Sequence, residues 1–180
     1  MLLTADRLKT AGLFAGLVAL AAASRFLDIA PNFAAVAGVA LFAGFIFRSR
    51  LLAVMVPVAA MLISDAILGG YPLAVMVSVY LCMMLPILFK PVLGAQPGVV
   101  RIAGSSLACS AIFFVVTNFA VWGTGGLGYA RTLAGLLECY TNALPFFRYT
   151  LLGDLVFSSA LFGAWAIASR PMAARAAVTS

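Results

Sequence analysis

The sequence contains no histidine, and charged side chains make up only 9% of its 180 residues. Without an imidazole, neither a Ser-His-Asp triad nor a histidine-ligated metal site can form. A soluble domain carries about a quarter charged residues, so this chain has too little polar surface to cover itself in water. These shortages exclude a soluble enzyme, a disordered protein and a DNA-binding domain.

Motifs for metal, cofactor and nucleotide chemistry are also missing. The three cysteines, Cys82, Cys109 and Cys139, lie in or beside apolar runs and form no CxxC pair. This placement is typical of unpaired apolar side chains rather than of a disulfide or zinc framework. No Gly-x-x-x-x-Gly-Lys-Ser/Thr loop is present, which excludes ATP hydrolysis by that route. We expect no metal, no cofactor and no enzymatic activity, and whether Cys82 or Cys139 contacts a ligand stays open.

Apolar residues dominate what is there: they fill 65% of the positions, and the mean hydropathy is +1.16. A transmembrane helix needs about 20 mostly apolar residues. Six such segments are predicted, the second of them short, at residues 8–24, 33–47, 51–68, 72–89, 102–122 and 146–169. Between the last two, a glycine-rich loop is followed by a predicted short amphipathic helix at 132–144. We therefore predict an all-α integral membrane bundle of six spans, forming one domain over residues 1–180.

The basic residues indicate how this bundle is oriented. Cytoplasmic loops of membrane proteins carry an excess of lysine and arginine. With a cytoplasmic N-terminus, the predicted inner segments hold Arg7, Lys9, Arg48, Arg50, Lys90, Arg101, Arg170 and Arg175, and the outer ones hold Arg25, Arg131 and Arg148. This bias predicts that both termini are cytoplasmic. The basic pI of about 9.7 then reflects topology and contact with the lipid bilayer, and no nucleic acid partner is needed.

The first hydrophobic segment has a second interpretation. Arg7 and Lys9, the apolar run 11–20 and the small residues at 21–24 resemble a cleavable signal peptide. Cleavage near Ala23 would leave five spans and would not change the later orientations. Retention is favoured, because the later spans already target the membrane and Arg25 is a poor residue directly after a cleavage site. Whether the segment is cleaved stays open.

Polar side chains within the predicted spans gather on one side. Such groups are costly in a bilayer, so their position is informative about function. In the predicted topology they occupy the outer third, together with four of the five tyrosines, with Trp122 and with Asp28. An aromatic cavity with a few convergent polar groups suits a small molecule. The predicted ligand-binding residues are Arg25, Asn32, Asp65, Asn118, Trp122, Tyr140, Arg148 and Asp154.

A purely structural role for the same residues is the alternative. Arg25 with Asp65, or Arg148 with Asp154, would then form ion pairs between helices, and Asn118 an interhelical hydrogen bond. Tyrosine and tryptophan also favour membrane interfaces whatever the function. Because the whole cluster lies on one side, a binding site is the favoured interpretation.

The first segment also carries a regular pattern of small residues. Ala11, Ala15 and Ala19 recur every fourth position, so they lie on one helix face and allow a partner helix to approach closely. That partner is either a helix of the same bundle or a separate protein. The residues alone leave both open.

Several short motifs resemble an uncharacterised family of small bacterial multi-spanning membrane proteins. They run from about residue 25 to 163 and include Pro31-Asn-Phe33, Ser64-Asp65, Thr117-Asn-Phe119, Cys139-Tyr140 and Gly153-Asp154. In architecture the chain is similar to the S components of energy-coupling-factor vitamin transporters. This resemblance implies a location in the bacterial inner membrane and an outward-facing pocket for a vitamin- or cofactor-like solute. It also implies that the alanine face docks on a transmembrane coupling subunit, which works with separate ATPases.

The expected function is the binding of a small organic solute from the outer face, for uptake. Residues 33–47 and 123–145 are the candidates for a moving lid. The alternative is an accessory structural subunit of a larger membrane complex. An intramembrane enzyme using Asp65 and Asp154 is the least favoured hypothesis, because proton relay or counter-ion roles suit these carboxylates better than hydrolysis does.

Overall fold

The structure is a computed structural model that describes residues 2–27 and 29–178, with side chains for 6–27 and 29–169. Asp28 and the side chains of Arg170 and Arg175 lie outside the described part. Every regular element within the described residues is helical, which confirms the all-α prediction. In chain order these are α1 (Leu2–Ser24), α2 (Val36–Ile46), α3 (Arg50–Leu68), α4 (Leu73–Met84), η1 (Leu85–Phe89), α5 (Lys90–Leu93), α6 (Val99–Gly123), η2 (Gly126–Gly128) and α7 (Leu133–Val178).

Five stretches of helix are long and apolar enough to cross a membrane. They are Asp6–Ser24, Arg50–Leu68, Leu73–Leu93, Val99–Gly123 and Leu133–Ser169, and each contains or closely matches a predicted span. The remaining helix, α2, has 11 residues. It is therefore about 16 Å long, roughly half the thickness of the hydrocarbon layer. Membrane-type helices are thus confirmed, while the count of six spans stays a prediction.

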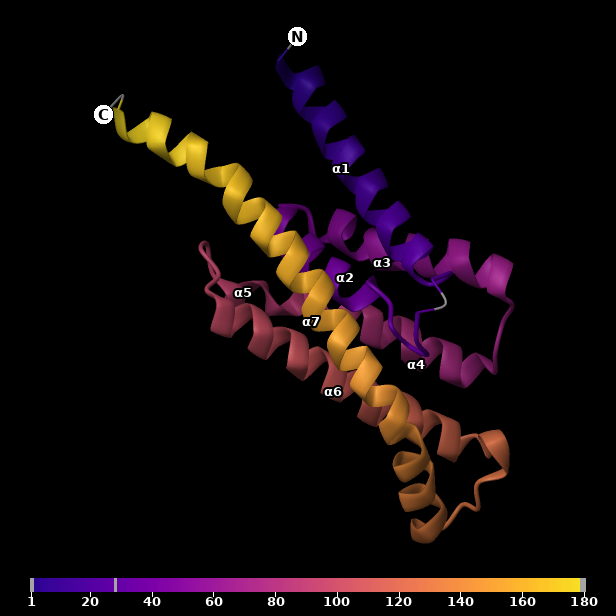
Figure 1. Cartoon of the computed structure of the whole chain (residues 1–180). Helices are drawn as coiled ribbons and strands as arrows, with labels where there is room; N and C mark the ends of the chain where they lie inside the picture. The colour runs from indigo at the N-terminus through magenta and orange to yellow at the C-terminus, as the bar shows by residue number, and fades with distance from the viewer. Residues whose placement is uncertain (1, 28, 179–180) are drawn as a thin grey trace.

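The short helix α2 occupies the centre of the bundle (Figure 1). All nine residues from Val36 to Gly44 are buried. A helix that is apolar on every side is stable only when other helices surround it. Two glycines permit this: a Cβ on Gly44 would lie 2.7 Å from the Ile87 Cα of η1, and one on Gly38 would lie 3.0 Å from the Ser158 nitrogen of α7. The central helix is thus in backbone contact with its neighbours.

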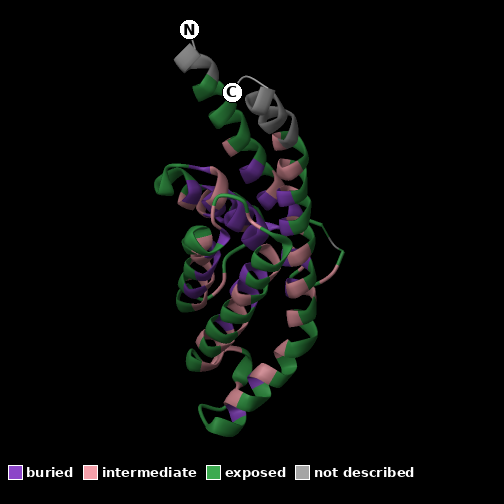
Figure 2. Ribbon diagram, turned by 90° about the vertical axis from the view of Figure 1, so that its left-hand side faces the viewer, coloured by how far each residue is buried: buried purple, intermediate pink, exposed green. Residues whose placement is uncertain are grey.

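The long helices around α2 turn apolar faces outward. Figure 2 shows exposed residues along the outer faces of these helices and buried residues inside. The exposed set includes large apolar side chains such as Leu51, Ile67, Val100 and Ile167. In water such a surface would aggregate, whereas lipid tails cover it at no cost. The surface therefore agrees with a bundle that lies in a membrane.

The two ends of the bundle differ. The start of α1 and the end of α7 lie at the same end (Figure 1). The opposite end, called the distal end below, carries the connections at residues 25–35, 69–72 and 124–132. Which side of the membrane each end faces stays a prediction from the basic residues.

One predicted element is wrong. The short helix expected at 132–144 is not separate, because α7 runs without interruption over 46 residues and includes Pro145. A proline inside a helix removes one hydrogen bond and bends the helix more often than it ends it. Figure 1 shows such a bend in the orange part of α7, where α6 and α7 project beyond the other helices. The apolar part of α7, 37 residues, is about 55 Å long, so the α6–α7 hairpin exceeds the hydrocarbon thickness or is strongly tilted.

Candidate functional site

A cavity of about 360 Å³ opens at the distal end. This volume lies within the range of small-molecule sites, roughly 300–1,000 Å³. Aromatic and thioether side chains line it, including Phe33, Phe113, Met61 and Met83. Its polar lining groups come from three different parts of the chain and are Arg25, Asn32, Tyr71, Thr150 and Asp154. Such a mixture can hold the face of an organic ring while a few polar groups fix its orientation.

The α1–α2 connection, residues 25–35, supplies one wall of this cavity. Ser24 joins the two ends of the connection, because its hydroxyl donates to the Ala21 carbonyl at 2.7 Å and accepts from the Ala35 N–H at 2.8 Å. Asn32 has a positive φ of 63°, a conformation that asparagine tolerates better than most residues. The connection also packs closely on α7, where a Cβ on Gly153 would lie 3.1 Å from the Ala34 oxygen.

This wall differs from the lid candidates expected at 33–47 and 123–145. Most of the first candidate is α2, which is buried at the centre, and only its leading residues reach the cavity. No residue of 123–145 lines the cavity at all. Arg25 and Asn32 of this connection are predicted ligand-binding residues, and both line the cavity. The rest of the connection is not predicted as a wall, because a loop has no hydropathy pattern.

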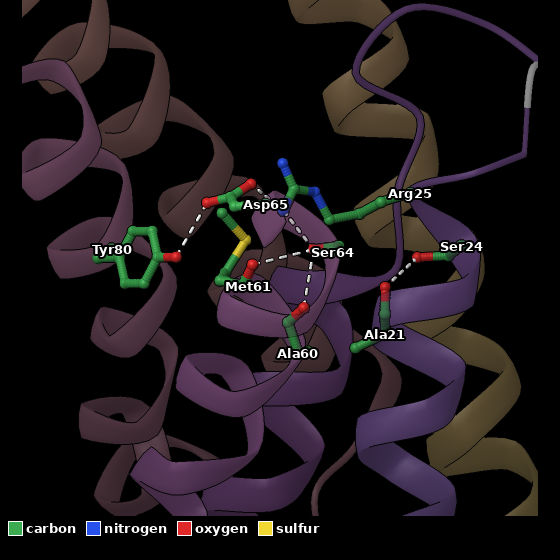
Figure 3. A network of polar contacts seen from close by, with 8 residues as sticks. All are labelled: Ala21, Ser24, Arg25, Ala60, Met61, Ser64, Asp65 and Tyr80. Atoms are coloured by element: carbon green, nitrogen blue, oxygen red, sulfur yellow. Dashed lines mark hydrogen bonds and ion pairs between the residues drawn. The ribbon is translucent and has the colours of Figure 1, made fainter. Parts of the chain in front are cut away.

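Arg25 crosses from the end of α1 to α3 (Figure 3). Its Nη1 lies 2.5 Å from Asp65 Oδ1 and also donates to the Ser64 hydroxyl. The Ser64 hydroxyl in turn donates to the Ala60 carbonyl at 2.7 Å. The Arg25 and Asp65 side chains are only 18% and 9% exposed, so the pair is shielded from water. This is one of the two ion pairs considered for the structural alternative, and it is formed.

The second oxygen of Asp65 is engaged as well. The Tyr80 hydroxyl of α4 donates to Asp65 Oδ2 at 2.9 Å, so the network joins α1, α3 and α4 (Figure 3). Tyr71 lies nearby in the connection between α3 and α4. Burial raises the pKa of the Tyr71 phenol, and the charge of Asp65 raises it further against the opposing effect of Arg25. Tyr71 is therefore a neutral hydrogen-bond donor at the cavity wall throughout the physiological pH range.

Asp154 lines the same cavity from α7, and only 3% of it is exposed. Its Oδ2 lies 2.5 Å from the Ser110 hydroxyl of α6. The second ion pair considered, Arg148 with Asp154, is not formed in the described residues. Arg148 instead donates to the Tyr149 hydroxyl at 2.8 Å, with its guanidinium carbon 4.5 Å from the centre of that ring.

Three further predicted residues lie in the α6–α7 hairpin and do not line the cavity. Tyr140 donates to the Val115 carbonyl at 2.7 Å, which fastens α7 to α6. The Trp122 indole donates to the Ala130 carbonyl at 2.9 Å. The interhelical hydrogen bond considered for the Asn118 side chain is not found among the described residues. The Asn118 amide instead donates at 2.8 Å to the Phe114 carbonyl of its own helix.

The structure thus divides the eight predicted residues into two groups. Arg25, Asn32 and Asp154 line the cavity, and Asp65 binds Arg25 beside it. The others, Asn118, Trp122, Tyr140 and Arg148, lie in the projecting α6–α7 hairpin or beside its bend. Hydropathy predicts that both groups lie at one end of the bundle. It does not predict which of them face the cavity, because that depends on how each helix is rotated about its axis.

The cysteines show no sign of a ligand site. All three are buried and free, and Cys82 and Cys139 do not line the cavity. Cys139 instead packs against α6, with its sulfur 3.5 Å from the backbone carbonyl oxygen of Asn118. Among the described residues, no three histidine, cysteine or acidic side chains gather in a way that would hold a metal ion.

The small-residue face of α1 is not used inside the bundle. Ala11, Ala15 and Ala19 are all exposed. A Cβ placed on Gly12 or Gly16 would meet nothing within 4 Å. Among the described residues this face does not pack within the bundle, and docking on a separate protein stays a prediction.

Comparison with known protein families gives one match. The family model described as "Family of unknown function (DUF6580)" matches residues 6–176, which is nearly the whole chain. The chain belongs to this family. Neither the curated proteins nor the solved structures include a match. Membership of DUF6580 agrees with the expected uncharacterised family. It assigns no activity to the chain.

Proposed function

We propose that this DUF6580 protein binds a small organic solute in the distal cavity and takes part in its uptake. The observation that carries the proposal is the cavity itself, where Arg25 of the α1–α2 connection and Asp154 of α7 line one space together with aromatic side chains. Small-molecule sites are mostly apolar clefts with a small number of placed polar groups. A bundle that served only to pack against lipid would have no need of such a space.

The chemistry of the lining favours a flat, partly polar solute. Phe33 and Phe113 offer ring faces, and Met61 and Met83 offer polarisable sulfur that adapts to an aromatic ring. Arg25, Asn32 and Tyr71 supply hydrogen-bond donors near one wall. A vitamin- or cofactor-like heterocycle fits this combination better than a sugar or a lipid chain does.

The proposed direction is inward. The basic residues predict six spans with both termini in the cytoplasm of a bacterial cell, which places the distal end outside. The solute would then enter from the outer face of the inner membrane, in a role similar to that of an S component. In that case a transmembrane coupling subunit with separate ATPases would supply the energy.

The direct test is to identify a bound solute. Small molecules released from the gently purified protein are analysed by mass spectrometry, and a panel of vitamins and cofactors is screened by thermal shift. A ligand that binds only the folded state raises its stability, so one stoichiometric species or one clear stabiliser would support the proposal. If no species co-purifies and no compound of the panel stabilises the protein, solute binding is the wrong function.

The exposed alanine face favours a second candidate, an accessory subunit of a larger membrane complex. Small residues that meet nothing within the bundle leave a smooth strip on α1, which suits close helix contact. This candidate predicts that a protein partner co-purifies without any solute. The two functions are compatible, since an S component would also dock through this face.

A further inference from the structure

Asp65 and Asp154, two acidic residues at the distal cavity, stand in opposite surroundings. Asp65 has an arginine on one oxygen and a tyrosine hydroxyl on the other. Asp154 is more deeply buried, and its one hydrogen-bond partner among the described side chains is the neutral hydroxyl of Ser110. A carboxylate without a cation in a low-dielectric interior is strongly disfavoured, so it takes up a proton or a counter-ion.

Among the described residues, no unpaired positive charge stands beside Asp154. The facing helix α2 contains no titratable residue, and α6 contributes only the Cys109 thiol nearby. The cavity lining also includes Arg25, which is already paired with Asp65, and the phenol of Tyr71. On α7 itself, Arg148 is exposed and bound to Tyr149.

The number of available hydrogens points the same way. The Ser110 hydroxyl lies 2.5 Å from Asp154 Oδ2 and 3.1 Å from the Ser106 carbonyl, yet it has one hydrogen to donate. If Asp154 is ionised, one of these two contacts lacks a hydrogen. If Asp154 is protonated, the acid donates to Ser110 and Ser110 donates to the Ser106 carbonyl. Both contacts are then true hydrogen bonds.

The polar contacts continue away from the cavity. The Ser106 hydroxyl lies 3.4 Å from that of Ser158, in the buried interface between α6 and α7. The Ser105 hydroxyl is buried nearby in sequence and has no hydrogen-bond partner. Asp154 therefore lies at the edge of a buried, serine-rich interface between α6 and α7, and unlike these serines it lines the cavity.

We propose that Asp154 is a proton-binding site that exchanges its proton through the distal cavity and is neutral at physiological pH. On binding, one O–H bond of a hydronium ion in the cavity breaks and an O–H bond forms on a carboxylate oxygen. A water molecule is left, and the charge of the side chain changes from −1 to 0. On release, the O–H bond of the acid breaks and a water molecule in the cavity takes the proton as hydronium.

This assignment also narrows the class of solute, a step that rests on the proposed function. The one hydrogen of the neutral acid is already donated to Ser110, so the other oxygen of Asp154 can only accept a hydrogen bond. A charged carboxylate would instead attract an ammonium group. The group that meets Asp154 is therefore a neutral hydrogen-bond donor of the solute, such as a ring N–H or an amide N–H. Arg25 and Tyr71 are donors in the same cavity, so acceptors on the solute are favoured there.

Infrared spectroscopy of the full-length protein in lipid vesicles tests the proton site without any solute. The wild type at neutral pH should show the carbonyl stretch of a protonated carboxyl group, and transfer to D₂O should shift this band as the proton exchanges through the cavity. Asp154→Asn should abolish the band, while Glu138→Gln, a change at an exposed acidic residue that does not line the cavity, should leave it unchanged. A wild-type spectrum without the band, or a band that persists in Asp154→Asn, overturns the proposal.

A second pair of variants keeps the test decisive if Asp154→Asn does not fold. Ser110→Ala removes the acceptor of the acid's hydrogen bond, so the band should shift to higher frequency. Ser105→Ala is the matched control, because that hydroxyl has no partner, and it should leave the band in place. An unshifted band in Ser110→Ala also overturns the assignment. Failure here is separable from failure of solute binding, since the band is recorded without a solute.

Discussion

Nη1 of Arg25 lies 2.5 Å from Oδ1 of Asp65, a contact that joins the residue directly after α1 to the last turn of α3. These residues are 40 positions apart in the sequence. The contact closes the distal end of the bundle on one side of the cavity. Arg25 both lines the cavity and holds α1 to α3. A solute that binds Arg25 would therefore bind a side chain whose position is fixed by the packing of two helices.

The first prediction concerns the energy of this ion pair. Asp65→Asn leaves the Arg25 guanidinium partly buried without its counter-charge, and we expect it to destabilise the protein by about 1–3 kcal/mol, since the pair is only partly shielded. Tyr80→Phe removes one hydrogen bond from the same carboxylate and should cost about 1 kcal/mol. Thermal unfolding in detergent measures both. Equal stability of the two variants would show that the pair contributes little beyond a neutral contact.

The second prediction concerns the close approach of the central helix. Gly44→Ala places a methyl group 2.7 Å from a backbone carbon of η1, which cannot move without the helix. We expect a loss of about 1–3 kcal/mol, as in other overpacked cores. Gly12→Ala is the matched control, since its added carbon meets nothing and alanine favours a helix by up to about 1 kcal/mol. The same melting experiment decides, and a Gly44→Ala protein as stable as Gly12→Ala would contradict the packing.

The third prediction separates the cavity from the rest of the distal end. Phe113 and Phe119 both lie on α6, but only Phe113 lines the cavity. Once a stabilising solute is known, Phe113→Ala should weaken its binding by roughly tenfold or more, the effect of about 1–3 kcal/mol for a lost aromatic contact. Phe119→Ala should bind as the wild type does. Binding is measured by calorimetry or by the ligand-induced shift in melting temperature, and equal losses in both variants would move the site into the α6–α7 hairpin.

The fourth prediction addresses the exposed face of α1. Ala15→Leu adds a bulky side chain to that face, so we expect a docked membrane partner to be lost in co-purification while solute binding is retained. The control is Ala111→Leu, an equal change at an exposed position of α6. A partner that is retained by Ala15→Leu, or lost equally by both variants, would show that docking does not use this face.

Hydropathy alone found the helices, because a membrane-length apolar segment satisfies its backbone hydrogen bonds within itself and needs no partner to be recognised. The same argument fails at Pro145. There the proline and the glycine-rich loop before it suggested a break, and the structure shows that α7 continues. The free-energy cost of one lost backbone hydrogen bond is small compared with the stabilisation from packing α7 along α6. That packing cannot be predicted from the sequence alone.

The sequence by itself determined that this is an all-helical protein with membrane-type spans, that its polar groups gather at one end, and that α1 carries a strip of small residues. Only the tertiary structure decided which of those polar groups meet. A membrane helix can turn about its axis without changing its hydropathy, so the sequence left open whether Asp154 faces Arg148, which is six residues away, or Ser110 on another helix. Close packing at Gly38 and Gly153 fixes that rotation. As a result Asp154, which lines the cavity, lies beside the Ser110 hydroxyl and not beside a cation.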